Sequence, residues 1–182
     1  MNELLQEEKS IVTPIAGTTR DSIDSFLRYH KKDIRLIDTA GLRKKTKISG
    51  DIEFYSTVRT FRVIIDCDVA AVLIDAEKGF NNQDKDIIRY VIDSGKGLII
   101  VVNKWDLLEK NTHTLKEYKQ DIVDQYPVLD YYPILFISIA HNLRVREVLE
   151  STLKVFNERQ RKLKTPELNE FIKRAMAYHS PP

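Results

Sequence analysis

The stretch Leu98-Ile99-Ile100-Val101-Val102-Asn103-Lys104-Trp105-Asp106 decides the fold class of this chain. Its first five residues are apolar, and a continuous apolar run of this length is typical of a strand that is covered on both faces. Polar residues follow at once. Open α/β sheets place their ligands at the carboxyl ends of such strands. The stretch therefore predicts a buried parallel strand that ends in a ligand site.

Other apolar runs of strand length occur on both sides of this stretch, separated after residue 53 by segments with helical periodicity. The predicted strands are residues 25–29, 34–37, 69–74, 98–102 and 134–137, and the predicted helices lie near residues 53–65, 83–93, 115–125 and 145–159. This alternation predicts parallel βαβ units and a doubly wound α/β sheet. Only residues 30–33 separate the first two strands, which is too short for a crossover, so we expect one antiparallel strand at the sheet edge.

The end of the chain carries a separate helix signal. Thr165-Pro166-Glu167 supplies an N-cap and a proline at the first helical turn, which predicts a helix over residues 166–177. We interpret residues 1–164 as one domain, and residues 165–182 as the first helix of a second, α+β domain.

Composition excludes several classes of protein. Apolar residues make up 42% of the 182 residues, which is enough for one full core, and the net charge of +2 argues against a strongly basic nucleic-acid coat. No run approaches the roughly 18 apolar residues of a membrane span. Cys67 is the single cysteine and has no partner for an internal disulfide, and the first residues do not resemble a secretory signal. We therefore expect a cytoplasmic protein without a membrane span.

Asp106 is the most informative polar residue of the opening stretch. A carboxylate can accept hydrogen bonds from both the N1 and the exocyclic N2 donors of guanine, whereas adenine offers no such pair. Asn103 would support the base by bridging loops, and Lys104 by laying its aliphatic stem over the ring. The alternative is a solvated loop, but the position directly after a buried strand favours a guanine site.

A second polar stretch, Asp38-Thr39-Ala40-Gly41, also follows a predicted strand. Asp38 can hold Mg²⁺ through water, and the Gly41 amide can approach a terminal phosphate closely because no side chain intervenes. The alternative for this short pattern is a turn at the end of a strand.

Two further segments could complete such a site. Residues 17–21 read Gly-Thr-Thr-Arg-Asp, and the hydroxyl of Thr18 or Thr19 could complete Mg²⁺ coordination; the sequence does not choose between them, and a turn or cap is the alternative. The segment Ser138-Ile139-Ala140 follows the last strand and could lend a backbone amide to guanine O6.

Three motifs together resemble a known family. Residues 15–21 read Ile-Ala-Gly-Thr-Thr-Arg-Asp, residues 36–43 read Leu-Ile-Asp-Thr-Ala-Gly-Leu-Arg, and residues 101–107 read Val-Val-Asn-Lys-Trp-Asp-Leu. In this order they resemble the second GTPase domain of the Der (EngA) family, bacterial tandem GTPases of ribosome assembly. Residues 165–182 are similar to the opening of the KH-like domain that follows it. The resemblance implies a P-loop GTPase fold, GTP hydrolysis with Mg²⁺ and K⁺ stimulation, and action on the 50S ribosomal subunit and its rRNA.

The resemblance also assigns residues. The phosphate-side switch matches Asp38, Thr39, Ala40, Gly41 and Leu42, and the guanine motif matches Asn103, Lys104, Trp105 and Asp106. Gly41 and Thr19 are the expected catalytic positions, and Thr18, Thr19 and Asp38 the expected metal positions. Leu42 stands where many GTPases carry a water-orienting glutamine and cannot orient water by hydrogen bonding. The resemblance implies that K⁺ supplies the missing electrostatic stabilisation.

No Gly-x-x-x-x-Gly-Lys-Ser/Thr phosphate loop occurs in the 182 residues. That loop supplies the amides and the lysine that hold the β- and γ-phosphates, so we expect this chain to bind GTP weakly or not at all. By comparison with the family, the first strand of the sheet is missing as well. An incomplete sheet exposes backbone groups, so we expect a rearranged sheet or association with a second copy.

A binding module that does not need nucleotide is the alternative function. Two clusters of cations could contact rRNA phosphates. They comprise Arg43, Lys44, Lys45 and Lys47, and Arg159, Arg161, Lys162 and Lys164.

Overall fold

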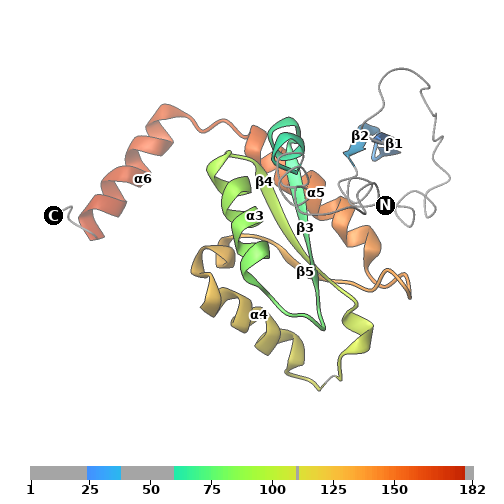
Figure 1. Cartoon of the computed structure of the whole chain (residues 1–182). Helices are drawn as coiled ribbons and strands as arrows, with labels where there is room; N and C mark the ends of the chain where they lie inside the picture. Colours follow the sequence, from blue (N-terminus) through green and yellow to red (C-terminus); the bar gives the residue numbers. More distant parts are fainter. Residues whose placement is uncertain (1–23, 38–59, 110, 179–182) are drawn as a thin grey trace, which may run out of the picture.

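A computed structural model describes residues 24–37, 60–109 and 111–178 (Figure 1). The strands are β1 (Asp24–Tyr29), β2 (Lys32–Ile37), β3 (Val69–Asp75), β4 (Gly97–Asn103) and β5 (Ile134–Phe136). The helices are α3 (Asn82–Asp93), α4 (Thr114–Gln125), α5 (Val145–Gln160) and α6 (Thr165–Tyr178), with short 3₁₀ helices η2 (Trp105–Leu107) and η3 (Pro127–Tyr131). Residues 60–66 are also helical, which agrees with the predicted helix over 53–65; its earlier part lies outside the described residues.

The three later strands form the expected parallel sheet in the order β3-β4-β5. The register pairs Asp75 with Asn103 and Val102 with Phe136, so the carboxyl ends of the three strands lie at one edge. All of β4 up to Val102 is buried, which confirms the doubly covered strand predicted from its continuous apolar sequence.

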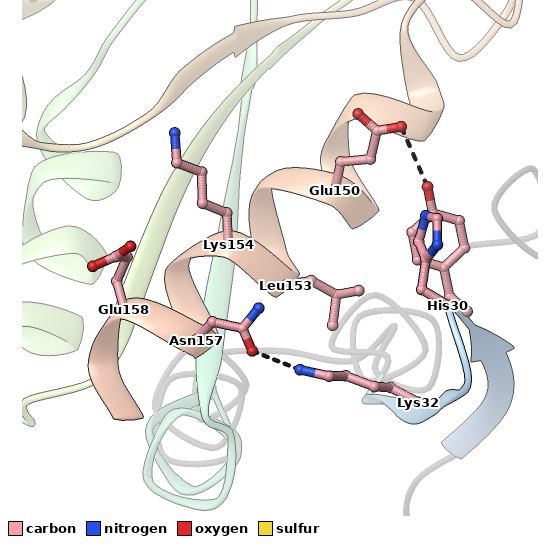
Figure 2. Close-up of a pocket in the computed structure, with 8 residues that line it drawn as sticks. His30, Lys32, Glu150, Leu153, Lys154, Asn157 and Glu158 are labelled. Atoms are coloured by element: carbon pink, nitrogen blue, oxygen red, sulfur yellow. Dashed lines mark hydrogen bonds between the residues drawn. The ribbon is translucent and has the colours of Figure 1, made fainter. Parts of the chain in front are cut away.

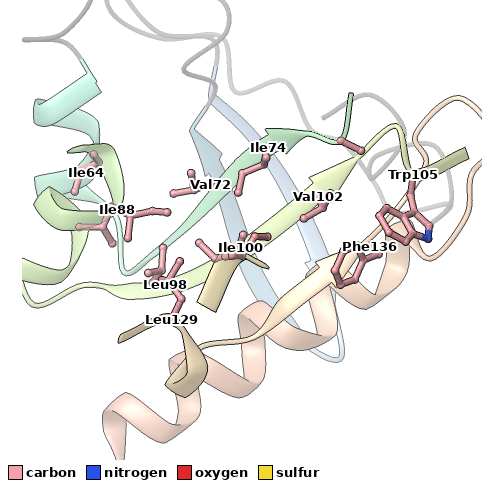
Figure 3. Packing of buried hydrophobic residues seen from close by; sticks show 13 residues of the cluster. Ile64, Val72, Ile74, Ile88, Leu98, Ile100, Val102, Trp105, Leu129 and Phe136 are labelled. Carbon is pink, nitrogen blue, oxygen red and sulfur yellow. The ribbon is translucent and has the colours of Figure 1, made fainter. Parts of the chain in front are cut away.

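Alternate residues of β4 enter two different cores. Leu98, Ile100 and Val102 pack with the helices α3 and α4 (Figure 3). Ile99 and Val101 pack on the opposite face against Val148 of α5. The strand period of two residues therefore divides one apolar run between two helical layers.

The first two strands pair in antiparallel register, as predicted, with Phe26 opposite Arg35. The turn is shorter than expected: His30 and Lys31 have φ values of 47° and 64°, a two-residue turn with positive φ, so Lys32 already belongs to β2. In the described part of the chain, this hairpin is a two-stranded sheet of its own and is not the edge of the parallel sheet.

The β1–β2 hairpin packs on helix α5. Leu27 and Tyr29 pack with Leu149, and the Tyr29 hydroxyl donates to Glu150 Oε1 at 3.3 Å. Lys32 Nζ donates to Asn157 Oδ1 at 2.5 Å (Figure 2).

A cleft of about 410 Å³ lies between the hairpin and α5 (Figure 2). Lys32 and Lys154 line it together with Glu150 and Glu158. Neither sign of charge predominates there, so the lining does not indicate an anion or a cation site.

Arg159, near the end of α5, ties that helix to the amino-terminal edge of the parallel sheet. Its guanidinium donates to the backbone oxygens of Asp68 and Gly95, the latter at 2.7 Å. Close packing accompanies this anchor: a Cβ at Gly97 would lie 2.8 Å from Val155 Cγ1 and 2.9 Å from Val69 Cγ2. The side chain predicted as an rRNA contact is thus engaged within the fold.

Helix α6 extends away from the rest of the chain (Figure 1). It spans Thr165–Tyr178, which agrees with the predicted helix over 166–177. Leu168, Phe171, Ile172 and Met176 form an exposed apolar stripe on it at helical spacing. Within the described residues, no helix is long and apolar enough to cross a membrane.

Candidate functional site at the carboxyl ends of the parallel strands

Backbone hydrogen bonds join the segments that follow the three parallel strands. The Ala76 amide, after β3, donates to Asn103 O at 2.9 Å, and the Trp105 amide, after β4, donates to Ile137 O at 3.0 Å. The guanine motif is therefore held between the ends of β3 and β5, where the sequence predicted a ligand site.

Asn103 links two of these loops through its side chain. Its Oδ1 accepts the Ile139 amide at 3.1 Å, which is the loop-bridging contact predicted for this residue. The Ser138 amide donates to Leu143 O at 3.1 Å. The Ser138 and Ile139 amides would each have to give up one of these hydrogen bonds to donate to guanine O6. The Ala140 amide would give up neither.

Asp106 lies in η2, with its side chain only 17% exposed. Its Oδ1 is buried, and its Oδ2 lies 3.5 Å from His141 Nε2. His141 was not expected at this site from the sequence. The sequence signal that could have indicated His141 was its position three residues after Ser138. The Ser138 Oγ accepts the His141 amide at 3.2 Å.

Lys104 adopts a left-handed backbone conformation, with φ 63° and ψ 30°, immediately before η2. Its Nζ lies 2.7 Å from Asp75 Oδ2 and 3.7 Å from Glu77 Oε2. We call Asp75 and Glu77 the acidic clamp. This pair was not expected from the sequence. Asp75 is the last residue of β3 and lies beside Asn103, which is the signal that could have indicated it.

The ion pair shifts both titrations. The hydrogen bond from Lys104 lowers the pKa of Asp75, and the same contact raises the pKa of Lys104. The pair therefore stays charged through the neutral range. Burial raises the pKa of Tyr118, whose hydroxyl donates to Ala76 O at 3.2 Å, between the two clamp residues.

Trp105 belongs to the core. Its ring lies 5.4 Å from that of Tyr118 and 4.5 Å from that of Phe136, and the residue is 4% exposed. The indole is thus a packing element of the core.

The residues predicted to bind phosphate and Mg²⁺ are a separate group. The residues concerned are Thr18, Thr19, Asp38, Thr39, Ala40, Gly41 and Leu42, and all lie outside the described residues. Strand β2 ends at Ile37, directly before Asp38. Among the described residues no group of three or more His, Cys, Asp or Glu side chains could hold a metal ion.

Comparisons with known proteins identify the family of this chain. A family model described as "50S ribosome-binding GTPase" matches residues 1–104, more than half of the chain. GTPase Der of Chlorobium phaeobacteroides is 48% identical over 97% of this chain and 41% of its own length. GTPase Der of Amoebophilus asiaticus is 42% identical over the whole chain and 42% of its own length. The chain thus spans about two fifths of these relatives.

Solved structures show the same fold. A single-residue variant of Aquifex aeolicus Era bound to GDP.AlF4- matches with a TM-score of 0.64 and 25% identity, over 85% of this chain and 50% of that one. Era in complex with MgGDPNP and nucleotides 1506-1542 of 16S ribosomal RNA matches with the same values. The resemblance to Der and the predicted P-loop GTPase-type α/β fold are confirmed. The chain belongs to the family of 50S ribosome-binding GTPases.

Proposed function

We propose that this chain is the guanine-recognition part of a GTP-hydrolysing domain that acts in assembly of the large ribosomal subunit. One observation carries the proposal: the partly buried Asp106 carboxylate and the Asn103–Ile139 bridge lie together at the carboxyl ends of adjacent parallel strands. A buried carboxylate that accepts hydrogen bonds from two donors of one base discriminates against bases that lack those donors.

Groups from two loops would contact the edge and the face of the guanine base. Asp106 would accept hydrogen bonds from the N1–H and N2–H groups of guanine, and the Ala140 amide would donate one to O6. Lys104 offers its methylene stem to the face of the ring. Asn103 keeps the two contributing loops together through Ile139. Each group comes from the end of β4 or from the loop after β5, so the sheet fixes the shape of the base site.

The proposal places the phosphates and Mg²⁺ near Thr18, Thr19 and Asp38, because hydroxyl and carboxylate oxygens are the ligands that this ion prefers. Gly41 would present its amide to the γ-phosphate. Leu42 supplies no hydrogen bond to water, which favours K⁺ as the stimulating ion. The Era structures bound to GDP.AlF4- and MgGDPNP support the Mg²⁺ and guanine-nucleotide part of the proposal.

The proposed partners are the 50S subunit and its rRNA, in the cytoplasm. We further propose that residues 165–182 open a KH-like domain. The exposed apolar stripe of α6 and the greater length of the relatives support this domain. The alternative is rRNA binding without nucleotide. Arg159 of its second basic cluster is engaged within the fold, and its first cluster, residues 43–47, lies outside the described residues.

The 182-residue chain should bind guanine nucleotides weakly, with a dissociation constant of about 1 mM, because base contacts act without a phosphate loop. Saturation-transfer NMR with GDP and ADP at millimolar concentration tests the function. We expect transfer to GDP that guanosine displaces, and little transfer to ADP. Equal transfer to both nucleotides would contradict guanine recognition, and a micromolar affinity for GTP with Mg²⁺ would refute the weak binding.

Self-association completes the proposal. Leu73 of β3 is 55% exposed although it lies in a sheet strand, and the hairpin does not pair with β3 in the described chain. Burial of this surface by a second copy would remove apolar area from water. We expect a concentration-dependent dimer by light scattering that Leu73→Lys weakens at least about tenfold. Leu163→Lys, at a site 56% exposed, is the matched control; a monomer at all concentrations would be the contrary result.

A further inference from the structure

Lys104 is held at its charged end. Its ammonium contacts Asp75 at 2.7 Å and Glu77 at 3.7 Å, so both members of the acidic clamp face one cation. The side chains of Lys104 and Asp75 are 46% and 23% exposed. An exposed ion pair of this kind adds little to folding stability, and its contacts place the Lys104 ammonium beside Asp75 and Glu77.

The clamp is itself rigidly built. Asp75 uses its two oxygens separately: Oδ2 faces Lys104, while Oδ1 accepts the Glu77 amide at 3.1 Å. The amides of Lys78 and Gly79 both donate to Asp75 O at 3.1 Å, which closes the turn. Gly79 has a φ of 70°, a conformation that glycine adopts without strain.

Two neighbouring elements support this turn. The Ala76 amide donates to Asn103 O, and the Tyr118 hydroxyl of α4 donates to Ala76 O. Tyr118 packs in turn against Trp105, the residue that follows Lys104. The clamp and the guanine motif are thus connected through the backbone and through the aromatic core.

The register of the sheet explains why the clamp reaches Lys104. Asp75 pairs with Asn103, so the carboxylate at the end of β3 lies beside the residue that precedes Lys104. A lysine without such a partner would distribute its flexible stem over many rotamers, and binding a base would have to order it.

We propose that Asp75, assisted by Glu77, is a positioning residue that anchors the Lys104 ammonium so that the methylene stem is held ready for the face of the guanine ring. This inference rests on the proposed function. It assigns the clamp a role in affinity and none in the choice between bases, because Asp75 acts through Lys104 and not on the hydrogen-bonding edge of the base.

Asp75→Asn tests the inference, because it keeps the shape of the side chain and removes its charge. We expect the affinity of the 182-residue chain for GDP to fall about three- to tenfold, while the preference for GDP over xanthosine diphosphate stays unchanged. Asp75→Glu should recover part of the loss, and Glu77→Gln should have a smaller effect. Asp86→Asn, an exposed acid of α3, is the matched control and should bind GDP as the unaltered chain does.

A double-mutant cycle separates positioning from a general structural effect. In a Lys104→Ala background, Asp75→Asn should cause no further loss of GDP affinity, and thermal unfolding of the variants should agree. An equal loss in that background, or an unchanged affinity in Asp75→Asn alone, would overturn the inference while leaving guanine recognition intact. Absence of any guanine preference in the unaltered chain would overturn the proposed function and the inference with it.

Discussion

Asp106→Asn should invert the base preference of this chain from guanine to xanthine. The carboxylate can accept hydrogen bonds from two N–H groups of guanine, whereas an asparagine amide would set its own N–H against one of them. Xanthine carries an oxygen in place of the exocyclic amine, so the amide can donate to that oxygen and accept the N1 proton. The ratio of GDP to xanthosine diphosphate affinity should fall by a factor on the order of 10³.

Saturation-transfer NMR with the two nucleotides in competition measures this ratio. Asp86→Asn is the appropriate control, since it makes the same chemical change on an exposed face of α3. Loss of GDP binding without any gain for xanthosine diphosphate would indicate that Asp106 maintains the loop and does not read the base. An unchanged ratio would place base recognition elsewhere in the chain.

Gly97→Ala should lower the stability of the chain, because the added methyl group has no room between β4 and α5. The new Cβ would lie 2.8 Å from Val155 and 2.9 Å from Val69, so strand β4 or helix α5 would have to move. Overpacking of this kind lowers the free energy of unfolding by about 1–3 kcal/mol. Urea denaturation followed by circular dichroism gives the difference directly.

A second substitution identifies the cause of that loss. Val155→Ala removes the closer of the two contacting atoms, so the additional loss caused by Gly97→Ala should shrink in this background. If the two losses simply add, the contact between β4 and α5 is not the origin of the effect. Retention of the full stability in Gly97→Ala alone would contradict the packing described for α5.

Sequence patterns predicted the parallel sheet well because its signals are local and strong. Residues 98–102 are apolar without interruption, and the structure buries all of them between two helical layers. The predicted helices over 83–93 and 145–159 agree with α3 and α5 to within one residue at each end. At the candidate site, the motif predicted that Asn103 bridges loops, and its Oδ1 accepts the Ile139 amide.

Other features depend on contacts that no local pattern carries. The turn at His30 and Lys31 has positive φ at both residues without the Asn-Gly or Gly-Gly sequence that usually announces it. Arg159 belongs to a basic segment that suggests a solvated surface. Its guanidinium instead donates to two backbone oxygens and links α5 to the parallel sheet. The Asp75–Lys104 pair joins the end of β3 to the residue after β4, and the separate sequences of the two strands give no indication of their register.

The attachment of the hairpin to α5 also sets an order of events during synthesis of the chain. The β1–β2 turn can close within microseconds, because its strands are neighbours in sequence. The hydrogen bond from Tyr29 to Glu150 spans 121 residues, which a ribosome adds on the order of ten seconds later. Throughout that interval Leu27 and Tyr29 have no α5 to cover them. The apolar side chains of the hairpin therefore gain their contacts with α5 only after that helix has been synthesised.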